Sequence, residues 1–204
     1  MKKQLLLLVM MILPMVASAD ESGSYGENVT WTYVEAKQTL LLSGSGAMDD
    51  RPYQERYNIP WNSHIDNIIK IVIEDGITNI GNYAFYCCSS VLSVEIPESV
   101  TSIGMYAFSG CTSLPSIVIP HSVTSIEQDA FSNCSSLTSI VIPDHVNYIG
   151  PCAFQYCSCL VSVSIPQGIM NIHQLTFSGC EALTSVTIPN SVTTIENNAF
   201  CNCI

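Results

Sequence analysis

The feature that most constrains this chain is a repeat of 23 residues that occupies its last two thirds. Three residue types recur at this interval, each in its own register. They are Pro97, Pro120, Pro143, Pro166 and Pro189; Phe85, Phe108, Phe131, Phe154, Phe177 and Phe200; and Cys88, Cys111, Cys134, Cys157, Cys180 and Cys203. The shared period divides residues 68–204 into six units, of which the last is incomplete.

Each unit predicts one short strand followed by a tight turn. In the unit 137–159, Ile140 and Ile142 share one face of a strand, because side chains alternate along strands. Pro143 ends the strand, since it has no N–H for a ladder hydrogen bond. The second half, up to Phe154 and beyond, leaves room for one helical or 3₁₀ turn at most.

A single unit cannot fold alone, because its few apolar side chains do not offset the entropy of ordering its backbone. Successive units must therefore stack and form hydrogen bonds with their neighbours. Strands stacked in register form a parallel sheet with a spacing of about 4.8 Å. We therefore predict an α/β, mostly β, solenoid with one parallel sheet and about six coils.

The consensus LxxIxIPxxVxxIxxxAFxxC resembles the BspA-type leucine-rich repeats of bacterial and protozoan surface proteins. The resemblance covers residues 68–204 and implies a right-handed solenoid. Upstream, apolar residues alternate in two runs, which predicts a β-hairpin: Val29, Trp31 and Tyr33, then Leu40 and Leu42. With Ile59–Trp61, this segment resembles the N-terminal cap of such arrays. We expect residues 20–67 to form a β cap over the first coil.

Residues 1–19 have the pattern of a secretory signal peptide. Lys2 and Lys3 precede the apolar run 5–16, and a small-residue site predicts cleavage after Ala19. The alternative, a short membrane anchor, is weaker because Pro14 interrupts a run that is too short to span. No other stretch is apolar enough for a membrane span. The chain is therefore expected to be secreted or on the cell surface.

The charge balance excludes one class of partner. Six Lys and Arg against 17 Asp and Glu give a net charge of −11. Binding of nucleic acid needs clustered cations, so no nucleic-acid partner is expected.

The six cysteines of the repeat register are predicted to be buried thiols, because a free Cys behaves as a small apolar side chain. Disulfides among them are the alternative, in a secreted protein with ten Cys. Four cysteines lie outside the register, on the turn side, and are the candidates for exposure or oxidation: Cys87, Cys152, Cys159 and Cys201.

No catalytic constellation is present in the sequence. Serines recur at repeat positions, and neither G-x-S-x-G, H-E-x-x-H nor a phosphate-binding Gly loop occurs. We expect no catalytic residue, no metal and no cofactor.

The outward face of the predicted sheet is the candidate binding site. It is small, flat, weakly polar and carries one charge, so it could accept a peptide or a glycan. Its residues are Ser93, Glu95, Ser116, Val118, Ser139, Val141, Ser162, Ser164, Ser185 and Thr187. The expected function is non-catalytic protein or glycan binding. The resemblance implies adhesion, including to host extracellular-matrix proteins. The alternatives are a structural spacer or fragment of a longer array and, less favoured, an extracellular enzyme.

The chain departs from the repeat pattern in two places. The fifth unit has His173 where Gly104 and Gly150 stand, and Thr176 in place of the usual Ala. The sequence ends at Ile204 without a closing cap. An apolar edge, a longer native array and self-association of two chains through the last coil all remain open.

Overall fold

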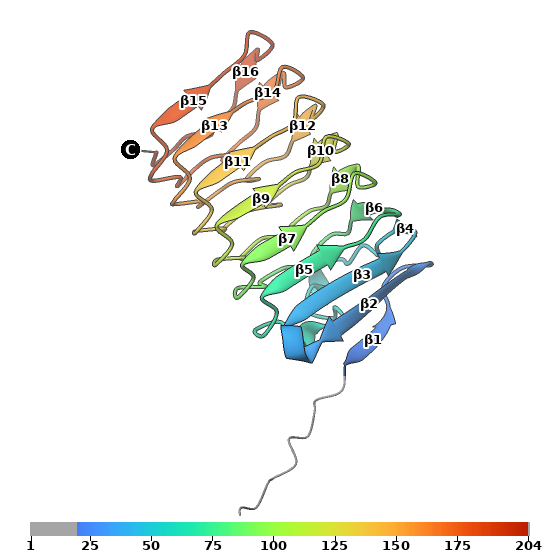
Figure 1. Cartoon of the computed structure of the whole chain (residues 1–204). Helices are drawn as coiled ribbons and strands as arrows, with labels where there is room; N and C mark the ends of the chain where they lie inside the picture. Colours follow the sequence, from blue (N-terminus) through green and yellow to red (C-terminus); the bar gives the residue numbers. More distant parts are fainter. Residues whose placement is uncertain (1–19, 204) are drawn as a thin grey trace, which may run out of the picture.

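The computed structural model describes residues 20–203, and the predicted signal peptide lies outside them. The chain forms a stack of coils with a small sheet at its N-terminal end (Figure 1). The solenoid and its mostly β character are therefore as predicted.

The N-terminal cap begins with an antiparallel sheet of β1 (Glu21–Ser24), β2 (Val29–Val34) and β3 (Thr39–Gly44). The predicted hairpin is β2 and β3, and Trp31 pairs with Leu42 while Tyr33 pairs with Leu40. These four side chains are buried. Strand β3 then pairs in parallel with β5 (Lys70–Ile73), so the cap continues directly into the stack of coils.

Each coil contributes one longer strand to the face that Figure 1 shows in front. These strands are β5, β7 (Ser93–Glu95), β9 (Ser116–Val118), β11 (Ser139–Val141), β13 (Ser162–Ser164) and β15 (Ser185–Thr187). Their pairing is parallel and in register, as between Ser116 and Ser139. Hydrogen bonding divides them into the sheets β1-β2-β3-β5-β7 and β9-β11-β13-β15. We call this row the long-strand sheet.

The prediction of a single parallel sheet is wrong, because each coil forms a second strand, which from β8 onward has only two residues and follows the repeat proline. These are β4 (Gly46–Ala47), β6 (Ile77–Ile80), β8 (Ser102–Ile103), β10 (Ser125–Ile126), β12 (Tyr148–Ile149), β14 (Asn171–Ile172) and β16 (Thr194–Ile195). We call this row the short-strand ladder. It forms because backbone groups that face the next coil need partners.

The helical turn allowed by the sequence is also absent from the coils. Among the described residues, the only helices are three short 3₁₀ turns in the N-terminal segment, at η1 (Glu35–Lys37), η2 (Tyr53–Glu55) and η3 (Asn62–His64). In the coils, Tyr83, Phe85 and Cys87 donate backbone hydrogen bonds to carbonyls of the next coil at 2.8–2.9 Å.

These bonds form a third row of hydrogen bonds between coils, beside the long-strand sheet and the short-strand ladder. Two residues in every coil with left-handed backbone conformation make this row possible. These residues are Tyr83, Tyr106, Asp129, Cys152, Leu175 and Asn198, and then Cys87, Gly110, Asn133, Tyr156, Gly179 and Asn202. Left-handed backbone alternating with right-handed backbone turns every second N–H group toward the next coil, while the N–H groups between them donate within their own coil. A helical turn would instead satisfy these groups within the coil.

Phenylalanine rings form a dry column along the stack, which we call the spine together with the adjacent cysteines. The rings of Phe108 and Phe131, and those of Phe131 and Phe154, lie 5.4 Å apart between centroids and almost parallel. All three side chains are fully buried. The inward register derived from the repeat is therefore confirmed.

The cysteine register is a ladder of thiols, as predicted. Cys134 Sγ donates to the carbonyl of Phe108 at 3.2 Å, and Cys157 Sγ repeats this contact with Phe131 at 3.3 Å. Burial raises the pKa of the Cys134 thiol well above its ordinary value. All ten cysteines are free, so the alternative of disulfides in the ladder is not realised. Of the four off-register cysteines, Cys159 and Cys201 are exposed.

Candidate binding surface

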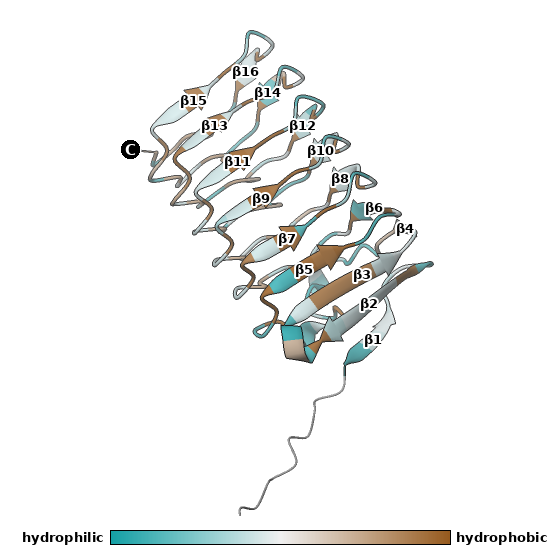
Figure 2. Ribbon diagram, in the orientation of Figure 1, coloured by the Kyte–Doolittle hydropathy of each residue, from teal (hydrophilic) through white to brown (hydrophobic). Residues whose placement is uncertain are grey.

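The outer face of the long-strand sheet carries the ten predicted binding residues. In each three-residue strand from β7 to β13, the middle side chain is buried and the two flanking ones are exposed. Strand β15 follows the same pattern, with its middle residue half-buried. The strands start with pale serines beside brown valines and isoleucines (Figure 2). All ten predicted residues therefore lie together on one solvent-facing surface.

The surface has almost no net charge. Its one charged member, Glu95, forms an ion pair with Lys70 on the neighbouring strand β5. Residues 71–204 contain no Lys or Arg, so the rest of the sheet face has no cation. A ligand for this face would be held by hydrogen bonds and apolar contact rather than by charge.

Two valines stand out at the centre of this face. Val118 and Val141 are register partners on β9 and β11, and their side chains are 80% and 79% exposed. They border a hollow of about 380 Å³ that extends to His121 and Pro143. The pair of Ser116 and Ser139 forms its polar edge. An apolar floor with polar edges is the usual composition of a binding site.

A cluster of tyrosines on the turn side of the first coils was not predicted from the sequence. Tyr83 and Tyr106 stack at 4.9 Å, and Tyr86 packs edge-on against both. Arg56 from the cap lies over the ring of Tyr53 at 4.0 Å. The interval of 23 residues between Tyr83 and Tyr106 was the signal that could have revealed their stacking.

Within residues 20–203, no three His, Cys, Asp or Glu side chains are grouped so that they could hold a metal ion. Over the same range, no helix has the length and apolarity that crossing a bilayer requires.

Comparison with known proteins identifies the repeat. Residues 78–204 match the BspA type leucine rich repeat region in six copies. The chain belongs to the BspA-type leucine-rich repeat family. Among curated proteins, none matches this chain.

Solved structures of bacterial leucine-rich repeat proteins share the fold. A Bacteroides ovatus protein is 27% identical with a TM-score of 0.67, over 87% of this chain and 50% of that protein. A T. pallidum protein is 24% identical with a TM-score of 0.63, over 84% and 85%. A Eubacterium ventriosum protein is 23% identical with a TM-score of 0.62, over 91% of this BspA-type chain and 64% of that protein.

Proposed function

We propose that this chain is a secreted or cell-surface recognition module that binds a protein or a glycan without catalysis. The ligand would lie along the outer face of the long-strand sheet. The observation that supports this most directly is the exposed pair Val118 and Val141 above a hollow. When a partner covers exposed apolar side chains at the centre of a polar face, the burial of apolar surface stabilises the complex.

The rows of small side chains suit an extended or flat ligand. Serines repeat along the face at the strand spacing of about 4.8 Å, so a ligand can make similar hydrogen bonds to successive coils. Small side chains lose little rotamer entropy when they are covered. Adhesion to host extracellular-matrix proteins stays an expectation that comes from the family resemblance.

Two other functions stay open beside this one. A spacer in a longer array would need only the core and a soluble face, and the small serines of the sheet suit that role as well. An extracellular enzyme is disfavoured, because no specific observation supports one. The proposed export of the chain depends on residues 1–19, which lie outside the described residues.

The test is a binding screen against matrix proteins and a glycan array. Val141→Arg and Ser139→Arg place a cation on the proposed surface and should abolish binding of any ligand found. Thr124→Arg is the matched control, because Thr124 is exposed beside the short strand β10 and gains the same charge. All three variants should keep the thermal unfolding midpoint of the wild type within a few degrees.

The outcomes separate the alternatives. Loss of binding in Val141→Arg with retention in Thr124→Arg supports the sheet face. Equal loss in both variants would show that charge alone weakens binding, and the proposed surface would be wrong. If nothing in the screen binds the wild type and the chain associates only with itself, the spacer function is favoured.

A further inference from the structure

The short-strand ladder is interrupted between the coils 137–159 and 160–182. Strands β6, β8, β10 and β12 form one continuous ladder, and β14 pairs only with β16. Elsewhere a backbone N–H after each short strand donates to the isoleucine carbonyl of the preceding coil, as Gly150 does to Ile126 at 2.8 Å. Within the described residues, no such bond joins His173 to Ile149.

The same two coils remain joined on the other side of the solenoid. The rings of Phe154 and Phe177 stack at 5.4 Å with planes only 4° apart. The N–H of Phe154 donates to the carbonyl of Thr176 at 2.9 Å. On the long-strand sheet, however, β11 and β13 keep only the pair of Ser139 and Ser162. The coils are therefore held together at the spine and part from each other on the opposite side.

Pro151 distinguishes this junction from the junctions that keep the bond. A Cβ added to Gly150 would lie 2.5 Å from the nitrogen of Gln128 in the preceding coil. One repeat later, the register places His173 opposite Pro151. A side chain at this repeat position is not by itself the obstacle, because Glu127 keeps the regular bond to the carbonyl of Ile103 at 2.9 Å. The nitrogen of Pro151 carries a ring carbon instead of a hydrogen, so this position has more bulk and one hydrogen-bond donor fewer than Met105 or Gln128 in the same register.

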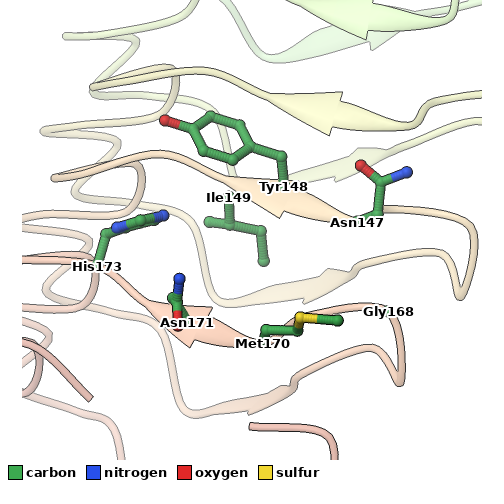
Figure 3. Close-up of a pocket in the computed structure, with 7 residues that line it drawn as sticks. All are labelled: Asn147, Tyr148, Ile149, Gly168, Met170, Asn171 and His173. Atoms are coloured by element: carbon green, nitrogen blue, oxygen red, sulfur yellow. The ribbon is translucent and has the colours of Figure 1, made fainter. Parts of the chain in front are cut away.

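A cleft of about 320 Å³ lies between the two coils at the parted junction (Figure 3). Asn147, Tyr148 and Ile149 line it from one coil, and Met170, Asn171 and His173 from the next. The rings of Tyr148 and His173 lie 5.5 Å apart and tilted by 56°. Glu196 of the following coil fixes the imidazole through a 2.9 Å hydrogen bond to Nδ1.

The cleft is bounded at both ends, which limits the shape of a ligand. At one end, Gly168 packs so closely on the preceding coil that an added Cβ would lie 3.0 Å from the carbonyl oxygen of Val146. At the other end, the coils close again on the phenylalanine column. A compact ring fits between these contacts, whereas an extended peptide would have to pass through them.

The charges around the cleft disfavour an anion. No Lys or Arg lines it. Burial raises the pKa of Tyr148, and the nearby carboxylates of Glu127 and Glu196 raise it further by smaller amounts. The phenol therefore stays protonated and can donate a hydrogen bond at neutral pH.

We propose that this cleft binds one neutral sugar ring. Tyr148 and Met170 offer apolar contact for a ring face, and Met170 is 67% exposed. The amides of Asn147 and Asn171 offer donors and acceptors for adjacent hydroxyls. The carbonyl of Ile149 and the N–H of His173, which lost their partners, add two more. The volume is within the usual range for small-ligand sites. This site lies away from the long-strand sheet and does not depend on the proposed function.

Titration of the whole chain with the methyl glycosides of glucose, galactose, mannose and N-acetylglucosamine tests the site, with sialic acid as an anionic probe. At least one neutral glycoside should bind and sialic acid should not. Tyr148→Ser and Asn171→Ser should each weaken binding at least tenfold. Both variants install the residue that Ser125 and Ser102 already provide in other coils, so the fold is preserved.

Val141→Arg on the sheet face should leave this binding unchanged, which separates the site from the proposed function. Hydrogen exchange gives a second readout: the amides of Met170 and His173 should exchange fast in the free chain and slow when sugar binds. Absence of glycoside binding would overturn the proposal, and so would slow exchange of these amides in the free chain. If the chain instead binds a peptide, and Tyr148→Ser abolishes that binding, the ligand of the cleft is a peptide and the sugar proposal is wrong.

Discussion

The spine and the short-strand ladder run along opposite sides of the same coils and differ in regularity. Phenylalanine centroids are 5.2 Å apart in the first step of the spine and 5.4 Å in the last. The short-strand ladder, in contrast, stops between β12 and β14. Spine residues are hidden and repeat in every coil, so packing fixes their spacing. The first residue of each two-residue short strand from β8 to β14 is exposed or half-buried and varies, so the ladder is less constrained by packing than the spine.

The largest expected effect comes from the spine. Phe131→Ala removes a fully buried ring from the column and should lower the free energy of unfolding by about 3–5 kcal/mol. Val141→Ala, at a position 79% exposed, should change it by less than about 0.5 kcal/mol. Urea unfolding measures both. A small loss for Phe131→Ala would contradict the view that the spine holds the coils together.

An added methyl group at a close junction should cost more stability than truncation of the side chain at the parted one. Gly150→Ala puts a Cβ 2.5 Å from the backbone nitrogen of Gln128 and should cost about 1–3 kcal/mol of unfolding free energy. His173→Ala adds no atoms near Pro151 and should cost less than about 1 kcal/mol. Equal losses in urea unfolding would mean that the two junctions are packed alike.

The thiol ladder gives a smaller effect of the same kind. Cys134→Ala removes a buried sulfur and its hydrogen bond to Phe108, at an expected cost of about 1–2 kcal/mol. Cys159→Ala, at an exposed position, is the matched control and should be close to neutral.

The same cysteines should differ in reactivity with pH. Burial raises the pKa of Cys180 to about 12, so its reactive thiolate stays scarce as the pH rises past 9. Cys159 and Cys201 are exposed and should be labelled first by a thiol reagent in the native chain. Mass spectrometry of the labelled peptides checks the order. Early labelling of Cys180 in the native chain would show that the ladder opens.

The smallest effect on stability is expected where the ladder is already broken. His173→Gly installs the residue found at the closely packed positions Gly81, Gly104 and Gly150 and should let the backbone of coil 160–182 approach Pro151. The unfolding free energy should change by no more than about 1 kcal/mol, because the gained contact is offset by the entropy of glycine and by loss of the pair with Glu196. In this variant, slower exchange of the amides of residues 170 and 173 would show that the junction has closed. Unchanged exchange would show that Pro151 alone keeps the junction open.

Much of the fold could be predicted because residues such as Phe131 and Cys134 recur at one interval. A constant interval together with a dry core leaves stacking as the only arrangement that buries them all. Strand alternation then placed Ser139 and Val141 outward with Ile140 inward, as the burial pattern has it. The proposed role of these outward residues in binding stays a prediction.

The second half of each coil could not be predicted in the same way. Its two-residue strands, such as Tyr148–Ile149, are too short to show an alternation in the sequence. Its left-handed positions are occupied by residues as different as Tyr83, Leu175 and Asn198, so no residue type marks them. Their conformation follows from hydrogen bonds to the next coil, which is a contact between units and not a property of one unit.

The sequence by itself determined the repeat, the direction of each apolar side chain and the composition of the outer face. These depend on periodicity, which is a one-dimensional property of the chain. Only the tertiary structure decided how closely each coil approaches the next. Nothing in the sequence marks Pro151, and it matters because stacking places its coil against the coil of His173. The cleft between their coils therefore exists only once the chain is folded.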